Sequence, residues 1–184
     1  MSDDFYRAFE ERHRGAFEAI QERMRAYLPF VAPLKELYPD APAIDVGCGR
    51  GEWLALLREA GFRVEGVDID EAMLAPARER GLPVRVADGI EYLRGLAEKS
   101  VSVVSAFHVV EHLPFETVQA LVREALRVLK PGGMLILETP NVENLVVATS
   151  GFYMDPTHVH PLPAGLLTFL AEHYGFHRVK LLRL

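Results

Sequence analysis

The chain has 184 residues, of which 49% are hydrophobic and 25% charged, as in a single globular domain with one core. No apolar run approaches the roughly 18 residues of a membrane span, and the formal charge of -6 argues against broad nucleic-acid binding. The single cysteine excludes an intramolecular disulfide and the N-terminus lacks a signal-peptide layout, so we expect a reducing, cytoplasmic setting.

The N-terminal region, residues 1–42, is predicted to be a helical arm packed on a domain formed by residues 43–184. Apolar residues recur at helical spacing over residues 3–28, and prolines then divide residues 28–42 into short connecting pieces. Within the arm, the guanidinium group of Arg12 or Arg14 would suit a carboxylate ligand. The alternative for this stretch is a solvated helix face.

Residues 43–184 alternate predicted strands with predicted helices. We expect strands at 43–46, 63–67, 84–86, 101–107, 134–138 and 178–182, and helices at 52–60, 71–80, 89–96, 116–129 and 164–174. Pro76 predicts a late start or a kink in the second of these helices. The long loop at residues 139–163 is interpreted as a lid. The alternation is typical of an α/β, doubly wound, mostly parallel sheet with helices on both faces.

Three glycines at alternate positions follow the first strand, in Asp45-Val-Gly-Cys-Gly-Arg-Gly51. Glycine permits positive φ angles and lets a ligand approach the backbone, and the helix that follows presents unpaired N–H groups. About twenty residues further on, Asp68 ends the second strand, at the spacing that places an acid against a ribose diol. The third glycine comes one residue too early for the dinucleotide pattern G-x-G-x-x-G. The stretch therefore predicts a nucleoside ligand other than a dinucleotide.

This stretch resembles motif I of the class I S-adenosylmethionine (SAM) dependent methyltransferases, an acid followed by G-x-G-x-G, and the resemblance covers residues 43–182. It implies a Rossmann-like fold, from which the family's seventh, antiparallel strand is expected to be missing here. It also implies SAM as methyl donor and S-adenosylhomocysteine as product. The residues that it assigns to SAM are Asp45, Gly47, Cys48, Gly49, Gly51, Asp68, Ile69, Asp88, Gly89 and Arg14.

The resemblance gives these residues different roles. The glycines would pass the methionine part of SAM, and Arg14 would meet its carboxylate. Asp68 would accept hydrogen bonds from the ribose hydroxyls, and Asp88 would meet the adenine amino group, with Ile69 and Gly89 flanking the base. Asp45 would position the glycine stretch or reach the ammonium group. The structural alternatives are that Asp68 caps a turn and that Asp88 begins one.

Cys48 lies inside the glycine stretch. A position near a helix N-terminus lowers a thiol pKa, which would suit a nucleophile. No histidine is adjacent in sequence, and the stretch needs a small side chain at this position. We therefore assign Cys48 to ligand binding rather than to catalysis.

The segment His108-Val-Val-Glu111-His112 matches H-x-x-E-H, a pattern of zinc proteases. Zinc binding there requires both histidines on one helix face, whereas this segment follows a buried strand and meets a proline at once, so a protease is disfavoured. In the methyltransferase interpretation it lies at the carboxyl end of a strand, beside the methyl group. His108, Glu111, His112 and the loop residue His158 are therefore candidates for substrate contact or general base.

The loop also contains Asp155, His158 and His160. These side chains are either metal ligands or groups that fix the loop by hydrogen bonds to backbone, and we expect no metal site. The turn Glu138-Thr-Pro-Asn141 borders the same opening and is expected to shape the acceptor site.

The arginine-glycine arm and the segments FHVVEHLPF, ETPNVENL and FYMDPTHVHPLP together resemble a bacterial methyltransferase subgroup found with, or fused to, glycosyltransferases of surface polysaccharide assembly. The resemblance implies transfer of a methyl group to an oxygen or nitrogen, with a small molecule or a glycan hydroxyl as acceptor. It also implies a glycosyltransferase partner or a homodimer. Two alternatives stay open: a non-catalytic SAM-binding or partner-binding module, and an NAD(P)-dependent oxidoreductase, against which the glycine spacing argues.

Overall fold

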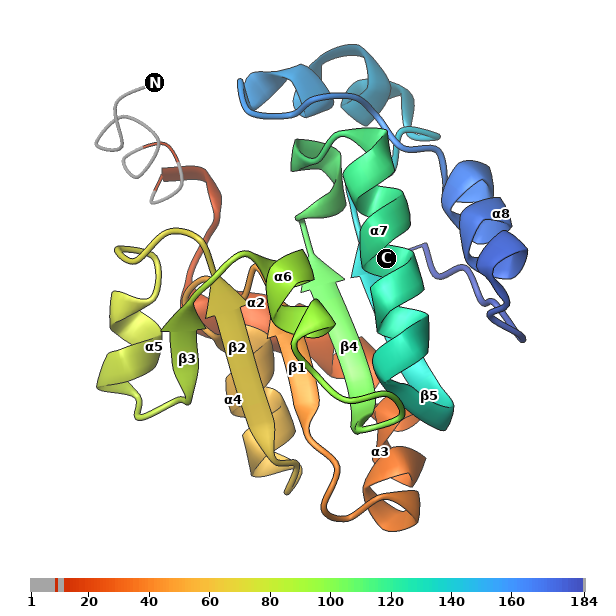
Figure 1. Cartoon of the computed structure of the whole chain (residues 1–184). Coiled ribbons are helices and arrows are strands. Elements are labelled where there is room, and N and C mark those ends of the chain that lie inside the picture. The colour runs from red at the N-terminus through yellow and green to blue at the C-terminus, as the bar shows by residue number, and fades with distance from the viewer. Residues whose placement is uncertain (1–8, 10–11, 184) are drawn as a thin grey trace.

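The structure is a computed structural model that describes residue 9 and residues 12–183. Its centre is a five-stranded parallel sheet in the order β3-β2-β1-β4-β5 (Figure 1). The strands are β1 (Ala43–Val46), β2 (Val64–Asp68), β3 (Val84–Val86), β4 (Val101–Phe107) and β5 (Leu129–Glu138). Because the strand order reverses between β1 and β4, the crevice at their carboxyl ends is where a doubly wound sheet binds its ligand.

Helices cover both faces of the sheet (Figure 1). One face packs against α2 (Phe17–Met24), the 3₁₀ helix η1 (Arg25–Tyr27), α3 (Leu28–Leu37) and α4 (Glu52–Glu59). The other packs against α6 (Gly89–Arg94), α7 (Phe115–Val128) and α8 (Ala164–Tyr174). The short helix α5 (Ala75–Glu79) packs with α4 and Cys48. The predicted doubly wound α/β fold is confirmed.

The strands carry one core on each face. Ala43 and Val103 lie in the cluster under α2, α3 and α4, whereas their neighbours Ile44 and Val104 lie in the cluster under α6 and α7. Successive strand side chains point to opposite faces, so a strand covered on both sides is apolar throughout. All of β4 is buried, which is why the valine-rich run at residues 101–107 predicted its boundaries correctly.

The predicted sixth strand, at residues 178–182, is wrong. These residues form no strand, and within the described part of the chain the sheet ends at β5, with neither a sixth nor a seventh strand. Arg178 has a φ angle of 60°, which is incompatible with an extended strand. The segment is held by side chains instead: Leu182 packs on the cluster under α2 and α3, and Arg183 pairs with Glu143.

The arm also differs from its prediction. Gly15 has a φ angle of 88° and residues 14–16 are not helical, so the predicted continuous helix is interrupted before α2; its residues 3–8 and 10–11 lie outside the described part. Residues 28–42, predicted as connecting pieces, contain α3. Pro29 lies in its first turn, where no N–H partner is needed, and burial of Val31 and Leu34 holds the helix despite the internal Pro33. The boundary at residue 42 stays a prediction.

The 139–163 loop lies above the carboxyl ends of the strands (Figure 1). It contains a π-helical turn, η3 (Val147–Gly151), and a 3₁₀ turn, η4 (Phe152–Met154), where the sequence predicted no regular structure. Phe152 and Leu162 are buried and anchor it to the domain. Its role as a lid stays a prediction. No helix in the described residues is both long and apolar enough to cross a bilayer.

Candidate functional site

The glycine loop, residues 47–51, joins β1 to α4. Gly47, Gly49 and Gly51 have φ angles of 67°, 48° and 83°, in the left-handed region. A Cβ atom on Gly47 would lie 2.4 Å from the side chain of Val109, and one on Gly51 would lie 2.5 Å from Leu82. Both the backbone angles and the surrounding space therefore require glycine, and the loop presents bare backbone at the mouth of the crevice.

Asp68, at the end of β2, fastens this loop. Its Oδ2 accepts a hydrogen bond from the backbone N–H of Gly49 at 2.9 Å, and its Oδ1 accepts one from Asp70 at 2.9 Å. The turn-capping alternative is thus realised. It leaves room for a ligand role, because a carboxylate offers about four lone-pair positions. The next residue, Ile69, is 76% exposed, which leaves a large apolar surface open beside the carboxylate.

Asp88 is the N-cap of α6, in agreement with the alternative that it begins a turn. Its Oδ1 accepts the N–H groups of Ile90 and Glu91, both at 2.9 Å. Gly89 is buried, and a Cβ atom there would lie 2.3 Å from Val46. Asp88 and Gly89 follow β3, so they stand next to Asp68 at the same edge of the sheet.

Asp45 is a buried acid below the glycine loop. Its Oδ1 accepts a hydrogen bond from the hydroxyl of Ser105, at 2.6 Å, from the adjacent strand β4. Burial raises the pKa of Asp45 to about 7, although the Ser105 hydrogen bond opposes this shift. The carboxyl group therefore changes its charge near neutral pH.

The side chain of Cys48 points away from the crevice. It is 4% exposed and packs among Leu54, Leu74 and Leu82. Burial raises the pKa of the thiol well above its usual range, so the reactive thiolate is disfavoured. Any contact of Cys48 with a ligand would come from its backbone.

Arg14 lies over the glycine loop. A Cβ atom on Gly49 would lie 2.9 Å from its Nη2 atom, and this same nitrogen is 3.6 Å from Oε2 of Glu52. Glu52, in the first turn of α4, is only 1% exposed. Of the two arginines considered in the arm, Arg14 is thus the one beside the loop.

The same acid also ties the arm to the domain through a second arginine. Arg50 donates through Nε to Glu52 at 2.7 Å and through Nη2 to the backbone oxygen of Gly15 at 3.0 Å. Sequence reasoning missed Glu52. Its signal was an acid in the first turn after the glycine stretch, two residues after an arginine.

His108, at the end of β4, has a φ angle of 54°, which is unusual for a residue with a side chain. Its Nδ1 lies 3.2 Å from Glu111 and its Nε2 lies 3.1 Å from Glu138. Burial opposes protonation, but the hydrogen bonds and charges of the two carboxylates outweigh it and raise the pKa of His108 to about 9. Both ring nitrogens of His108 thus face carboxylates, and its candidate roles in substrate contact and as a general base stay predictions.

The two carboxylates have further partners, Tyr27, which sequence reasoning did not include, and Thr139 of the predicted acceptor-site turn. Tyr27 of η1 donates a hydrogen bond to Glu138, and burial together with this carboxylate raises the pKa of the phenol beyond its usual range. Thr139 donates to Oε2 of Glu111 at 3.0 Å, and Glu111 is 1% exposed. These partners come from distant segments, and no local pattern signals them.

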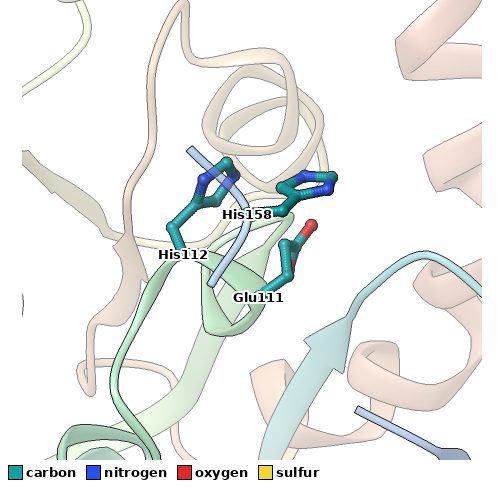
Figure 2. Close-up of side chains that lie close together, drawn as sticks. All are labelled: Glu111, His112 and His158. Atoms are coloured by element: carbon teal, nitrogen blue, oxygen red, sulfur yellow. The ribbon is translucent and has the colours of Figure 1, made fainter. Parts of the chain in front are cut away.

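The 139–163 loop brings His158 to the segment after β4. Figure 2 shows the side chains of Glu111, His112 and His158 pointing toward one space. The two imidazole rings have centroids 4.8 Å apart, and the backbone N–H of Val159 donates to the backbone oxygen of Glu111 at 2.8 Å. Of the loop histidines considered as ligands, His160 lies elsewhere, with its ring 6.5 Å from that of Phe115.

Comparison with known proteins identifies the family. Residues 16–181 match the model of a methyltransferase domain family. A crystal structure of a SAM-dependent methyltransferase from Archaeoglobus fulgidus has a TM-score of 0.86 and 36% identity, covering 96% of this chain and 76% of that one. The chain belongs to the SAM-dependent methyltransferases. The predicted family and the predicted methyl donor are confirmed.

Two curated relatives of the methyltransferase are shorter matches. A protein named as a probable SAM-dependent methyltransferase from Mycolicibacterium smegmatis is 37% identical over 135 residues, 72% of this chain and 51% of that protein. A ubiquinone biosynthesis O-methyltransferase from Xanthomonas oryzae is 34% identical over 106 residues, 55% of this chain and 44% of that protein. The chain thus spans about half the length of these relatives.

The donor side of the methyltransferase fits an adenosyl ligand. The glycine loop has no room for Cβ atoms, Asp68 and Asp88 stand at the same edge of the sheet, and Ile69, which follows Asp68, exposes its side chain. The individual roles of these residues stay predictions.

Proposed function

We propose that the chain transfers the methyl group of SAM to an acceptor oxygen held between the end of β4 and the 139–163 loop. The observation that supports this most is the contact of Val109 with the glycine loop, whose Gly47 would meet that side chain if it carried a Cβ atom. Val109 lies between His108 and Glu111, so the polar cluster stands directly beside the donor loop. Donor and acceptor would then share one opening, as transfer between them requires.

We assign the parts of SAM to residues according to where those residues lie around the glycine loop. Arg14 would bind the carboxylate of SAM, Asp45 its ammonium group, Asp68 the ribose hydroxyls and Asp88 the adenine amino group. Ile69 and Gly89 would flank the base, and the backbone of residues 47–51, with Cys48, would pass the methionine part. When bound, SAM supplies a methyl carbon activated by a sulfonium.

The acceptor side offers groups for proton removal, which His108 helps to position. Both ring nitrogens of His108 face carboxylates, those of Glu111 and Glu138, so this side chain would hold the two acids in place beside the acceptor. His112 and His158 each have Nδ1 against an oxygen atom, which leaves Nε2 to accept a proton. Alignment and the exclusion of water contribute the larger part of the rate in such a transfer.

For the acceptor we propose a sugar hydroxyl of a surface glycan, on the resemblance of the segments around residues 107–115 and 152–163. The curated relatives named for O-methylation support oxygen as the atom. The same resemblance supports a glycosyltransferase or a second copy of the chain as partner. The buried, unreactive Cys48 suits a reaction in the cytoplasm.

Mass spectrometry of the ligand released from the purified protein, with calorimetry against SAM and NAD, tests the donor. Transfer of a tritiated methyl group to glycan, protein and small-molecule fractions tests the acceptor. Label in the glycan fraction supports the proposal, and label only in another fraction overturns the glycan assignment. SAM binding without transfer to any fraction would identify a non-catalytic module, and NAD binding without SAM binding would overturn the donor as well.

A further inference from the structure

We propose that Glu111, His112 and His158 bind a divalent transition-metal cation of the zinc type. Each offers one ligand atom, and these atoms all lie within 4.8 Å of one another. Figure 2 shows that the three side chains converge from two segments that are far apart in sequence. His158 lies outside the sequence pattern H-x-x-E-H. The set of three ligands is therefore defined by the structure and not by the motif.

The hydrogen bonds of both imidazoles leave the metal-binding nitrogen available. Nδ1 of His158 lies 2.6 Å from the backbone oxygen of Phe152, which can only accept, so this nitrogen carries the proton. The Thr157 hydroxyl donates to Asp155 at 2.6 Å, so Nδ1 of His112, 2.8 Å from that hydroxyl, must be the donor. Both Nε2 atoms therefore present a lone pair, since Oδ2 of Asp155, 3.8 Å from Nε2 of His158, lies beyond hydrogen-bond distance. Histidine ligands of metals are oriented in this way, by an oxygen that accepts the other N–H.

Glu111 supplies the negative charge that a cation requires. Its side chain is 1% exposed and is held from two sides, by the hydroxyl of Thr139 and by Nδ1 of His108. A carboxylate with two partners still has lone pairs for a metal. A buried carboxylate that is fixed by hydrogen bonds is the usual state of a metal ligand of this type.

The ligand types select the class of ion. Two imidazoles and one carboxylate suit zinc, iron and their neighbours, whereas magnesium and calcium prefer sites made of oxygen atoms. Three protein ligands leave at least one coordination position open, as in catalytic rather than structural sites. The open position would face the acceptor side of the crevice, beside Val109 and the glycine loop.

The three candidate ligand atoms are farther apart than they would be around a bound metal ion. Ligand atoms about 2.0 to 2.1 Å from one zinc ion lie roughly 3.3 Å from each other in a tetrahedral arrangement. Glu111 and His112 are fixed to the end of β4, so we assign the contraction to His158 and the 139–163 loop that carries it. Binding of the ion should therefore draw this loop toward the sheet.

The consequence for chemistry rests on the proposed function, although binding of the ion does not. A hydroxyl bound at the open position has a lowered pKa. Its O–H bond would break with the proton passing to a solvent water, and the oxygen would use its electron pair to bond the methyl carbon. The C–S bond would break with its electron pair left on sulfur. In this state His112 and His158 would serve as ligands, not as proton acceptors.

Cobalt(II) titration of the full chain, stripped of metal by a chelator, tests the site through the visible absorption of the ion. We expect one bound ion, displaced by zinc, with affinity lowered at least roughly 100-fold in His112→Ala and in His158→Ala. His160→Ala is the matched control, since it removes a histidine of the same loop outside the cluster. Thr157→Val, which removes the partner of His112 and one hydrogen bond to Asp155 but no proposed ligand, should lower affinity by roughly 10-fold.

Equal cobalt affinity in the wild type and in His158→Ala would overturn the proposal, as would an equal loss in His160→Ala. Circular dichroism and SAM calorimetry on each variant show whether it is folded, and if His158→Ala fails to fold, the Thr157→Val result decides. Limited proteolysis within residues 139–163 should slow when zinc is added to the wild type and not to His112→Ala. Cobalt binding without SAM binding would refute the proposed function alone, and SAM binding without cobalt binding would refute this inference alone.

Discussion

The two sides of the crevice are built in different ways. The donor side consists of backbone: a loop of five residues whose shape requires glycine, tied by one acid, Asp68. The proposed acceptor side consists of side chains from separate segments, joined by contacts such as those of Tyr27 with Glu138 and of Thr157 with His112. The difference implies that donor binding depends on local conformation, whereas acceptor chemistry depends on the position of the 139–163 loop. The two should be separable by mutation.

The double variant His112→Ala/His158→Ala is expected to separate loss of methyl transfer from loss of SAM binding most strongly. Methyl transfer at saturating SAM should fall by at least about 100-fold, because the acceptor oxygen loses both of the groups that would activate it. The dissociation constant of SAM, measured by calorimetry, should change less than twofold. His160→Ala should leave both quantities unchanged. A comparable loss of SAM affinity in the double variant would show that the two sides are not separable.

Asp68→Ala should instead weaken SAM binding and leave the rate of methyl transfer at saturating SAM nearly unchanged. Two hydrogen bonds to a charged acceptor contribute about 3 kcal/mol together, so SAM should bind roughly 100-fold more weakly. The rate at saturating SAM should recover to within a few-fold. Asp70→Ala is the matched control, since this neighbouring carboxylate accepts only the N–H of Ala72 among its hydrogen bonds within the described chain. If Asp68→Ala binds SAM as the wild type does, the ribose assignment is wrong.

Arg14→Gln should distinguish binding of the amino-acid carboxylate of SAM from binding of its adenosyl part. Loss of a charged hydrogen-bond donor facing a carboxylate should weaken SAM binding roughly 10-fold. Binding of 5′-methylthioadenosine, which lacks the amino-acid carboxylate, should be unchanged in the same calorimetric experiment. Arg12→Gln, the other arginine of the arm, should affect neither ligand. Equal losses for both ligands would mean that Arg14 supports the loop and does not bind the carboxylate.

The smallest expected effect is a pH-dependent change in melting temperature caused by Asp45. Because burial raises its pKa to about 7, the folded chain keeps a proton that the unfolded chain releases from about pH 4 upward. The contribution of Asp45 to the stability of the SAM-free protein therefore falls as pH rises from about 4 to about 7. Asp45→Asn has no such proton, so its melting temperature should match the wild type near pH 4 and exceed it by several degrees near pH 8.

Asp40→Asn, which changes an exposed acid, provides the control for this experiment. A melting-temperature difference for Asp45→Asn that stays constant from pH 4 to pH 8 would contradict the raised pKa. In that case the pKa of Asp45 would have to be the same in the folded and unfolded chains.

The donor side could be predicted from the sequence because its determinants are local. Glycine at three alternate positions after a strand, followed by Asp68 at the end of the next strand, specifies both the turn and its partner. The strands were predictable for a similar reason, since β4 is buried on both faces and is therefore apolar throughout. Gly175, with a φ angle of 108°, likewise marked the end of α8.

The acceptor side and the chain ends could not be predicted in the same way. The contact of Thr157 with His112 joins residues far apart in the chain, and the two carboxylates that hold His108 charged come from different strand ends. The prolines near residue 30 suggested a break, but burial of Val31 and Leu34 stabilises α3. Residues 178–182 have a strand-like composition, yet they form no strand, and Arg178 has a left-handed conformation.

The buried Glu52 bears on the SAM contact that we propose for Arg14. The guanidinium group already lies 3.6 Å from the carboxylate of Glu52, so a ligand carboxylate at this position would compete with that acid for the same arginine. Under the proposed contact, SAM binding would be an exchange of counter-ions for Arg14, while Arg50 would remain paired with Glu52. Release of S-adenosylhomocysteine would reverse this exchange.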